Sequence, residues 1–436
     1  MVVSERKPYQ ADEFGENVEI DENVKAEFPA GSRILSVEPG GPGTWVQTAR
    51  IEIELANEDT RVYFKKGKQG DDGRTMMASA FEAEVALHAV IPEHVPKPIA
   101  WGTYKAQPHV HFYLCDFVEM SDRLPNPRKW AEAVARLHTR SAGKSPEGKF
   151  GFHVSTHLGH VPVDNSWRNS WESFWSQQMK SLLDYEESIK GQSDEFSELK
   201  VAFFRKVIPR LLRPLEAGGR KIKPCLIHSN LWPGNIKHKA EGRDLCIFDS
   251  CAYWGHNEAD LAVCRNPRYR LGKDYIDSYA QYMPEFPSHP ADEFDDRNAL
   301  YAMKFHVLLS ILYRNEPRYR QIAMDEMRRL VKKFPTGYAS YEEKAKDEVE
   351  IVESPTLLSV EPHVRDEEPR AHFVKHDLVE EERQHAAPPS GSSAESRAQE
   401  QRFRGEMNIP SAVLLALGVM GILIAYLLGV RVSLPE

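Results

Sequence analysis

The stretch HSNLWPGN, residues 228–235, decides the fold of this chain. It follows a short apolar run at 225–227 and precedes a second one at 245–248, which is followed directly by Asp249. Short apolar runs bounded by polar and turn-forming residues are typical of buried strands. The pattern therefore predicts a polar loop held between two strands, with the second strand bringing a carboxylate next to that loop.

Strand-like patterns come first along the chain, and helix-like patterns dominate after residue 120. Alternating or continuous apolar residues predict strands at 33–37, 49–55, 61–66, 95–104 and 111–120. After the third of these, the glycine-rich stretch 67–74 leads into the first of the predicted helices, which lie at 76–91, 129–140, 167–189, 195–212, 298–313 and 317–334. The expected fold class is α+β, with a small β-rich N-terminal lobe and a mostly helical C-terminal lobe. This layout resembles the two-lobed protein-kinase-like fold, in which ATP lies in the cleft between the lobes.

The 436 residues carry a net charge of −9, which is unevenly distributed. Residues 341–408 hold 17 Asp and Glu against 9 Lys and Arg and are poor in aromatics, which favours a disordered linker. The remainder is nearly neutral, so nothing indicates a nucleic-acid partner. The five cysteines are an odd number without a C-x-x-C pair, which argues against a disulfide framework and for a reducing compartment. The Cys and His residues do not have the spacings of a zinc finger or ribbon, which argues against zinc. The predicted domains are the two lobes at 1–120 and 121–340, the linker, and an apolar tail at 409–430.

The apolar tail predicts a membrane anchor. Residues 411–430, SAVLLALGVMGILIAYLLGV, contain no charge and are long enough to span about 30 Å of hydrocarbon as a helix. The N-terminus, MVVSERKPYQ, is too polar for a secretory signal. We therefore expect a single-pass tail anchor in the endoplasmic reticulum or mitochondrial outer membrane, with the catalytic domain facing the cytosol. Gly421, Ala425 and Gly429 form a stripe of small residues through which two such helices could pair as a weak homodimer.

Three further motifs give the two lobes a closer resemblance. HSNLWPGN is similar to H-G-D-L-W-x-G-N, the loop of the fructosamine/ketosamine 3-kinase family (the protein-ribulosamine 3-kinases), relatives of the aminoglycoside and choline phosphotransferases. The same family is indicated by IFDSCAYWGHNEADLA at 247–262, KFGFH at 149–153 and WRNSWESFW at 167–175. The resemblance covers about residues 30–335. It implies ATP-dependent phosphorylation of the C3 hydroxyl of ribulosamine or fructosamine, on glycated protein lysines or small ketosamines, leading to deglycation. Trp232 and GHNEADLA speak against an aminoglycoside or choline kinase.

Two residues are candidate ligands of Mg²⁺. Phosphoryl transfer depends mainly on positioning and on neutralising charge around the transferred group. Asp249 is the hard anionic oxygen ligand that Mg²⁺ requires, and Asn235 would add a neutral carbonyl oxygen, as the catalytic-loop Asn does in kinases. Asp249 could also be a simple strand-terminating residue, but its position after Asn235 favours the metal. The expected cofactors are ATP and Mg²⁺.

A lysine on the third strand should hold the α- and β-phosphates, paired with a glutamate on the following helix. The candidates are Lys65 and Lys66, which strand alternation places on opposite faces of the sheet. The family pattern, aromatic-x-Lys, fits either of them, and we choose Lys66. The spacing leaves Glu82 and Glu84 open as the partner, and we choose Glu84.

Weaker signals mark the nucleotide pocket. Gly41 and Gly43, in the turn-rich stretch PGGPGT at 39–44, could cover the phosphates with backbone N–H groups, although an ordinary hairpin turn explains the same residues. The segment with Asp116 and Val118 resembles the hinge between the lobes, whose backbone would contact adenine.

Tryptophans are the candidates for a sugar pocket. Trp232 lies inside the loop, beside the reacting group. Trp167 and Trp171 are four residues apart in a predicted helix, a spacing that fits either a substrate contact or a core stripe. Asp260, in GHNEADLA, is expected to cap a helix and brace the loop.

Two loop residues depart from the family pattern. Asn230 stands where the family has the aspartate that accepts the proton of the attacking hydroxyl, and Ser229 replaces a glycine. A carboxamide can orient a hydroxyl but cannot take up its proton. Losing a base typically costs about 10²–10⁴ in rate, whereas the contributions of metal and positioning remain. With Asn230 and His228 as the catalytic residues, we expect a ketosamine 3-kinase; the alternative is a membrane-tethered pseudokinase that binds nucleotide or sugar without efficient turnover.

Overall fold

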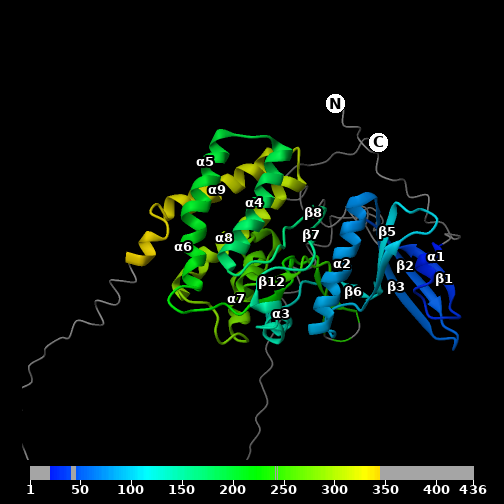
Figure 1. Ribbon diagram of the computed structural model, residues 1–436. Helices are drawn as coiled ribbons and strands as arrows, with labels where there is room; N and C mark the ends of the chain where they lie inside the picture. The colour runs from blue at the N-terminus through cyan, green and yellow to red at the C-terminus, as the bar shows by residue number, and fades with distance from the viewer. Residues whose placement is uncertain (1–19, 41–45, 241, 243, 344–436) are drawn as a thin grey trace, which may run out of the picture. The chain divides into compact units, whose positions relative to one another are not determined.

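The computed structural model describes residues 20–343, apart from 41–45, 241 and 243 (Figure 1). Gly41 and Gly43 lie outside the described residues, as do the predicted linker from residue 344 onward, the predicted anchor and its small-residue stripe. Within the described ranges, none of the helices combines the length and the hydropathy needed to cross a membrane.

An antiparallel five-stranded sheet forms the N-terminal lobe, in the order β1-β2-β3-β5-β4 (Figure 1). Its strands are β1 (Arg33–Pro39), β2 (Gln47–Glu54), β3 (Thr60–Gln69), β4 (Pro98–Thr103) and β5 (Val110–Asp116), preceded by the short helix α1 (Glu22–Lys25). Alternation buries Ile51 and Ile53 of β2 against one face. In the β3–β5 ladder Lys66 lies opposite Tyr113 and Lys65 opposite Leu114, so the two lysines lie on different faces.

Helix α2 (Gly70–Val90) joins β3 to β4 and packs against both the sheet and the core of the C-terminal lobe. Met77 packs against the sheet, and Leu87, three turns later, packs into the core of the C-terminal lobe. The glycine-rich stretch before the predicted helix is in fact the end of β3 and the first turn of α2. Gly73 permits this close approach, because a Cβ at that position would lie 2.4 Å from the carbonyl oxygen of Lys68.

The C-terminal lobe is mostly helical and has one large hydrophobic core. Its α-helices are α3 (Pro127–Ser141), α4 (Trp171–Lys190), α5 (Asp194–Ala202), α6 (Ile208–Leu212), α7 (Gly272–Ala280), α8 (Phe294–Leu312) and α9 (Pro317–Lys333). Its strands are short: β6 (Met120–Ser121), β7 (His157–Leu158), β8 (Val161–Pro162), β9 (Cys225–Ile227), β10 (Ile236–Lys239), β11 (Leu245–Ile247) and β12 (Tyr253–Gly255). The two-lobed α+β architecture predicted from the sequence is confirmed.

Two of the predicted helices differ from the structure at places that a local feature explains. The helix expected at 167–189 begins at Trp171, because the hydroxyl of Ser170 accepts the N–H of Ser173 and caps it there. The helix expected at 195–212 is divided into α5 and α6 by a π-helical turn at Phe203–Val207.

Candidate active site

Loop 228–235 lies between β9 and β10, and β11 brings Asp249 beside it. A buried carboxylate, Asp260, holds the start of the loop: it accepts the backbone N–H of His228 at 2.8 Å and that of Ser229 at 2.5 Å. Burial alone would raise the pKa of Asp260, but the hydrogen bond from His138 Nε2, at 3.1 Å, helps to keep that pKa below its ordinary value. Asp260 therefore braces the loop as a buried anion.

His228 organises the loop from inside. Its ring is fully buried; Nε2 donates to the carbonyl of Phe248 at 3.0 Å, and Nδ1 accepts the backbone N–H of Asn230 at 3.1 Å. Burial lowers the pKa of His228, so the ring is neutral, as this pattern of one donor and one acceptor requires. With both nitrogens engaged inside the protein, His228 holds the loop in position.

The two loop asparagines converge on one backbone carbonyl. Asn230 Nδ2 donates to the carbonyl of Asp249 at 3.0 Å, and Asn235 Nδ2 donates to the same oxygen at 3.3 Å. Asn235 Nδ2 also donates to the carbonyl of Asn230 at 3.0 Å. Because these bonds use the amide nitrogens, each Oδ1 is the atom that can act on a hydroxyl or a cation. A carboxylate at residue 230 could not make the bond to Asp249, so the loop is built around a carboxamide.

Lys66 of the N-terminal lobe and Asp249 of the C-terminal lobe form an ion pair. Lys66 Nζ lies 2.9 Å from Asp249 Oδ1, whereas Lys65 points to the hydroxyl of Tyr104 on the other side of the sheet. The charge of Lys66 holds the pKa of Asp249 below its ordinary value. Burial alone would lower the pKa of Lys66, but Asp249 outweighs it, so the pKa of Lys66 lies above its ordinary value. Both groups are therefore charged at neutral pH.

The donor set around Asp249 fits Mg²⁺. The Asp249 side chain is 55% exposed, which leaves a hard anionic oxygen accessible. Asn235, whose Nδ2 lies 3.3 Å from the backbone carbonyl of Asp249, could add its amide oxygen. One oxygen of this carboxylate already binds a cation, the ammonium of Lys66. Within the described part of the chain no cluster of three or more His, Cys, Asp or Glu could hold a metal ion. Mg²⁺ needs only a few ligands from the protein, because it keeps several of its waters and also binds the phosphates of the substrate.

Glu84 does not pair with Lys66 in this structure, contrary to the sequence expectation. It is buried, and its Oε1 accepts the backbone N–H of Ser250 at 2.9 Å and the hydroxyl of Ser250 at 3.0 Å. Its Oε2 has no hydrogen-bond partner among the described residues. Burial raises the pKa of Glu84 to about 7, despite these bonds and the nearby Lys66. The other candidate, Glu82, lies near the helix surface and binds His153 at 2.8 Å.

The segment after β5 connects the lobes. Asp116 ends β5, and the chain continues through Val118 to β6, which pairs with β10 of the C-terminal lobe. The Asp116 side chain forms an ion pair with Arg61 at 2.8 Å, and its backbone N–H donates to Lys97. These bonds leave Val118 as the better candidate for a backbone contact with adenine.

Trp232 lies over the loop that contains it. A Cβ added to Gly234 would lie 2.0 Å from the Trp232 ring, so the ring requires glycine at 234. The ring is half-buried, and its centroid is 6.3 Å from that of Tyr269. An aromatic face of this kind, fixed beside Asn230 in sequence, suits a sugar.

The other two tryptophans separate in the structure. Trp167 precedes α4, is half-buried and packs against Gly151 of the KFGFH motif. Trp171 is fully buried, and its Nε1 donates to the hydroxyl of Tyr301 at 2.8 Å. Trp171 is therefore a core residue.

Sequence reasoning missed two partners of the loop region. Glu258, in GHNEADLA, forms a buried bidentate ion pair with Arg297 of α8 at 2.8 and 3.0 Å, which fixes the segment that carries Asp260. Lys304, also on α8, donates to the hydroxyl of Ser229. The charged residue Glu258 inside a family motif was an available signal, whereas nothing in the sequence near 304 pointed to the loop.

Comparisons with known proteins identify relatives of this chain. Residues 32–333 match the model of the fructosamine kinase family. The chain is 28% identical over 236 residues to a chloroplastic protein-ribulosamine 3-kinase of Oryza sativa subsp. indica, covering 53% of this chain and 63% of the rice protein. It is 34% identical over 161 residues to ketosamine-3-kinase of Mus musculus, covering 37% of this chain and 47% of the mouse protein. The alignments thus span about half to two thirds of these relatives.

Solved structures support the fold. A fructosamine-3-kinase-type protein from Haemophilus somnus 129PT superposes with a TM-score of 0.54 at 19% identity, covering 71% of this chain and 96% of that one. A second, from Thermobifida fusca YX-ER1, gives a TM-score of 0.53 at 19% identity, covering 71% and 98%. The fold is therefore two-lobed and kinase-like. Because the family model matches well over half of its length, this chain belongs to the fructosamine kinase family.

Proposed function

We propose that the protein is an ATP-dependent ketosamine 3-kinase. It transfers the γ-phosphoryl group of ATP to the C3 hydroxyl of ribulosamine or fructosamine, forming the new P–O bond as the bond to ADP breaks and releasing the hydroxyl proton. On glycated protein lysines the phosphorylated sugar then leaves, so the consequence is deglycation. The observation that carries this proposal is the meeting of Lys66, Asp249 and Asn235 at loop 228–235.

The charges of this site suit a nucleoside triphosphate. Lys66 offers an ammonium to the phosphates, while Asp249 and Asn235 would hold Mg²⁺ through oxygen atoms. When bound, the ion supplies charge neutralisation on the phosphate oxygens. With Asp249 holding the ion, Lys66 would be free to pair with Glu84, whose charge already acts on Lys66 and whose Oε2 has no hydrogen-bond partner among the described residues; this is the pairing that the sequence predicts.

Asn230 limits the rate without removing the site. Its Nδ2 is fixed on the Asp249 carbonyl, so its Oδ1 can accept a hydrogen bond from the substrate hydroxyl and orient it. The proton leaves to water or to a phosphate oxygen, since a carboxamide cannot bind it. Because positioning and charge neutralisation dominate phosphoryl transfer, we favour a working kinase over a pseudokinase.

A phosphate-transfer assay tests the proposal directly. The full chain is incubated with labelled ATP, Mg²⁺ and either ribulosamine-lysine or fructosamine-lysine, and the phosphorylated product is measured. We expect transfer to at least one of them, and none to a matched ketosamine without the 3-hydroxyl. Transfer to neither substrate, with Mg·ATP still bound, would support the pseudokinase instead.

We propose in addition that residues 409–430 hold the protein at a cytosolic membrane surface, with Gly421, Ala425 and Gly429 available for pairing of two anchors. The support is the charge-free apolar sequence. Removing residues 409–436 is expected to move the protein from the membrane pellet to the soluble fraction at unchanged specific activity. Pelleting of the shortened chain with membranes would contradict the anchor.

A further inference from the structure

A lysine is buried behind the catalytic loop. Lys304 of α8 is 5% exposed; its Nζ donates to Ser229 Oγ at 2.7 Å and to the hydroxyl of Tyr253 at 3.3 Å. The ammonium also lies 4.7 Å from the centre of the Tyr253 ring. In the part of the chain that the structure describes, the polar partners of this cation are two hydroxyls and not a carboxylate. Burying an ammonium without an anion is unfavourable, so its presence calls for a function.

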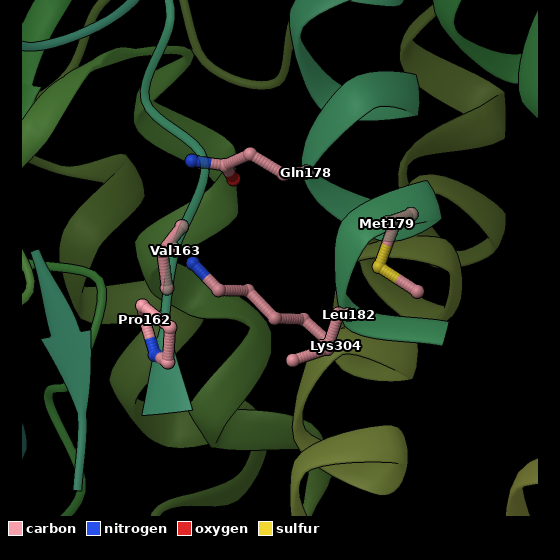
Figure 2. Close-up of a pocket in the computed structure, with 6 residues that line it drawn as sticks. All are labelled: Pro162, Val163, Gln178, Met179, Leu182 and Lys304. Atoms are coloured by element: carbon pink, nitrogen blue, oxygen red, sulfur yellow. The ribbon is translucent and has the colours of Figure 1, made fainter. Parts of the chain in front are cut away.

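The space beside Lys304 does not provide that function. The lysine side chain borders a small cavity with Gln178 opposite it and Val163 near its ammonium (Figure 2). The cavity is about the size of one water molecule, which is far too small for a sugar or a nucleotide. The contact that distinguishes Lys304 is therefore the one with the loop, at Ser229.

Ser229 has a backbone conformation that a serine adopts with strain. Its φ is +62°, in the left-handed region that favours glycine. Three hydrogen bonds hold it there: its N–H donates to Asp260 at 2.5 Å, and its Oγ accepts from Lys304 and donates to Tyr253 at 3.3 Å. The next residue is Asn230, so a change of φ at 229 would re-aim the carboxamide.

We propose that Lys304 and Ser229 form a positioning pair, which holds residue 229 in the left-handed conformation and thereby presents Asn230 to the substrate hydroxyl. The role of Asn230 rests on the proposed function. Lys304 acts through Ser229 and does not itself touch the substrate. In this chain the pair does what a glycine at 229 would do alone. Lys304 is therefore needed when residue 229 is serine and dispensable when it is glycine.

A double-mutant cycle tests the pair, using Ser229→Gly, Lys304→Met and the double variant in the full chain. Lys304→Met is expected to lower kcat about tenfold or more, with the KM for ATP changed less than about twofold, because a misaligned loop affects the reacting hydroxyl. The double variant is expected to regain activity to within about threefold of wild type, because glycine adopts a positive φ without help. Lys190→Met is the matched control: this lysine donates to three backbone carbonyls distant in sequence from the loop, and its loss should leave kcat unchanged.

Wild type, the two single variants of the pair and the double variant are also compared by urea unfolding, which needs no activity. The pair is supported if the free energy of unfolding of the double variant is higher than the sum of the two single changes predicts. Additive changes in the free energy of unfolding overturn it. Should Lys304→Met fail to fold, folding of the double variant supports the pair and its failure overturns it. A wild type that transfers no phosphate would refute the proposed function, while the unfolding cycle would still decide whether the pair exists. An activity loss in Lys304→Met that glycine at 229 does not rescue contradicts the positioning role.

Discussion

Replacing Asp249 with asparagine is expected to abolish Mg·ATP binding and to lower kcat/KM by about 10³, since several kcal/mol of charge stabilisation depends on the metal. Asparagine is the variant of choice because residue 249 has a φ of +56°, a conformation that asparagine tolerates better than alanine. The change removes one negative charge while it keeps the size of the side chain. Nucleotide binding is measured by calorimetry with and without Mg²⁺, and turnover by phosphate transfer.

Asp122→Asn is the control for this experiment. Asp122 also forms an ion pair with a lysine, Lys237 at 2.5 Å, but its side chain is 91% exposed and lies outside the predicted site. Surface pairs of this kind contribute little, so the control should bind nucleotide as wild type does. Equal Mg·ATP affinity in Asp249→Asn and wild type would show that the metal site has been assigned to the wrong residue.

Patterns of neighbouring residues are sufficient to predict the strands that carry the site. The period of two along β3 places Lys65 and Lys66 on opposite faces, and the structure has them on Tyr104 and Asp249 respectively. The apolar runs on either side of loop 228–235 likewise form β9 and β11. The opposite faces of the two lysines and the positions of these strands depend on residues close in sequence, which is why periodicity can predict them; the partners Tyr104 and Asp249 lie 39 and 183 residues away.

Features that depend on distant residues could not be predicted. Lys304 lies in an almost wholly buried helix, and which loop its ammonium reaches is decided by how α8 packs, 75 residues after Ser229. The partner of Glu84 is likewise set by tertiary contact: Ser250 follows Asp249 and offers two donors, so the carboxylate binds there and not to Lys66. Spacing on a helix fixes which residues share a face, but it does not fix what that face meets.

Restoring an aspartate at residue 230 is expected to raise the turnover of ribulosamine-lysine or fructosamine-lysine at least about tenfold, because it supplies a base that can take up the hydroxyl proton. The structure also shows what the change loses. A carboxylate cannot donate to the Asp249 carbonyl, which Asn230 Nδ2 contacts at 3.0 Å, but Asn235 Nδ2 remains 3.3 Å from the same oxygen. One hydrogen bond contributes about 1 kcal/mol, whereas a positioned base contributes roughly 3–5 kcal/mol, so the gain should prevail.

Asn230→Ala separates the two contributions of this side chain. Alanine removes both the bond to Asp249 and the oxygen that orients the hydroxyl, so turnover should fall while the KM for ATP stays near that of wild type. Faster turnover in Asn230→Asp together with slower turnover in Asn230→Ala would show that the wild-type carboxamide positions the hydroxyl and that the proton step limits the rate. If Asn230→Asp is no faster than an already active wild type, the proton leaves without a side-chain base, and orientation alone explains why residue 230 is a carboxamide.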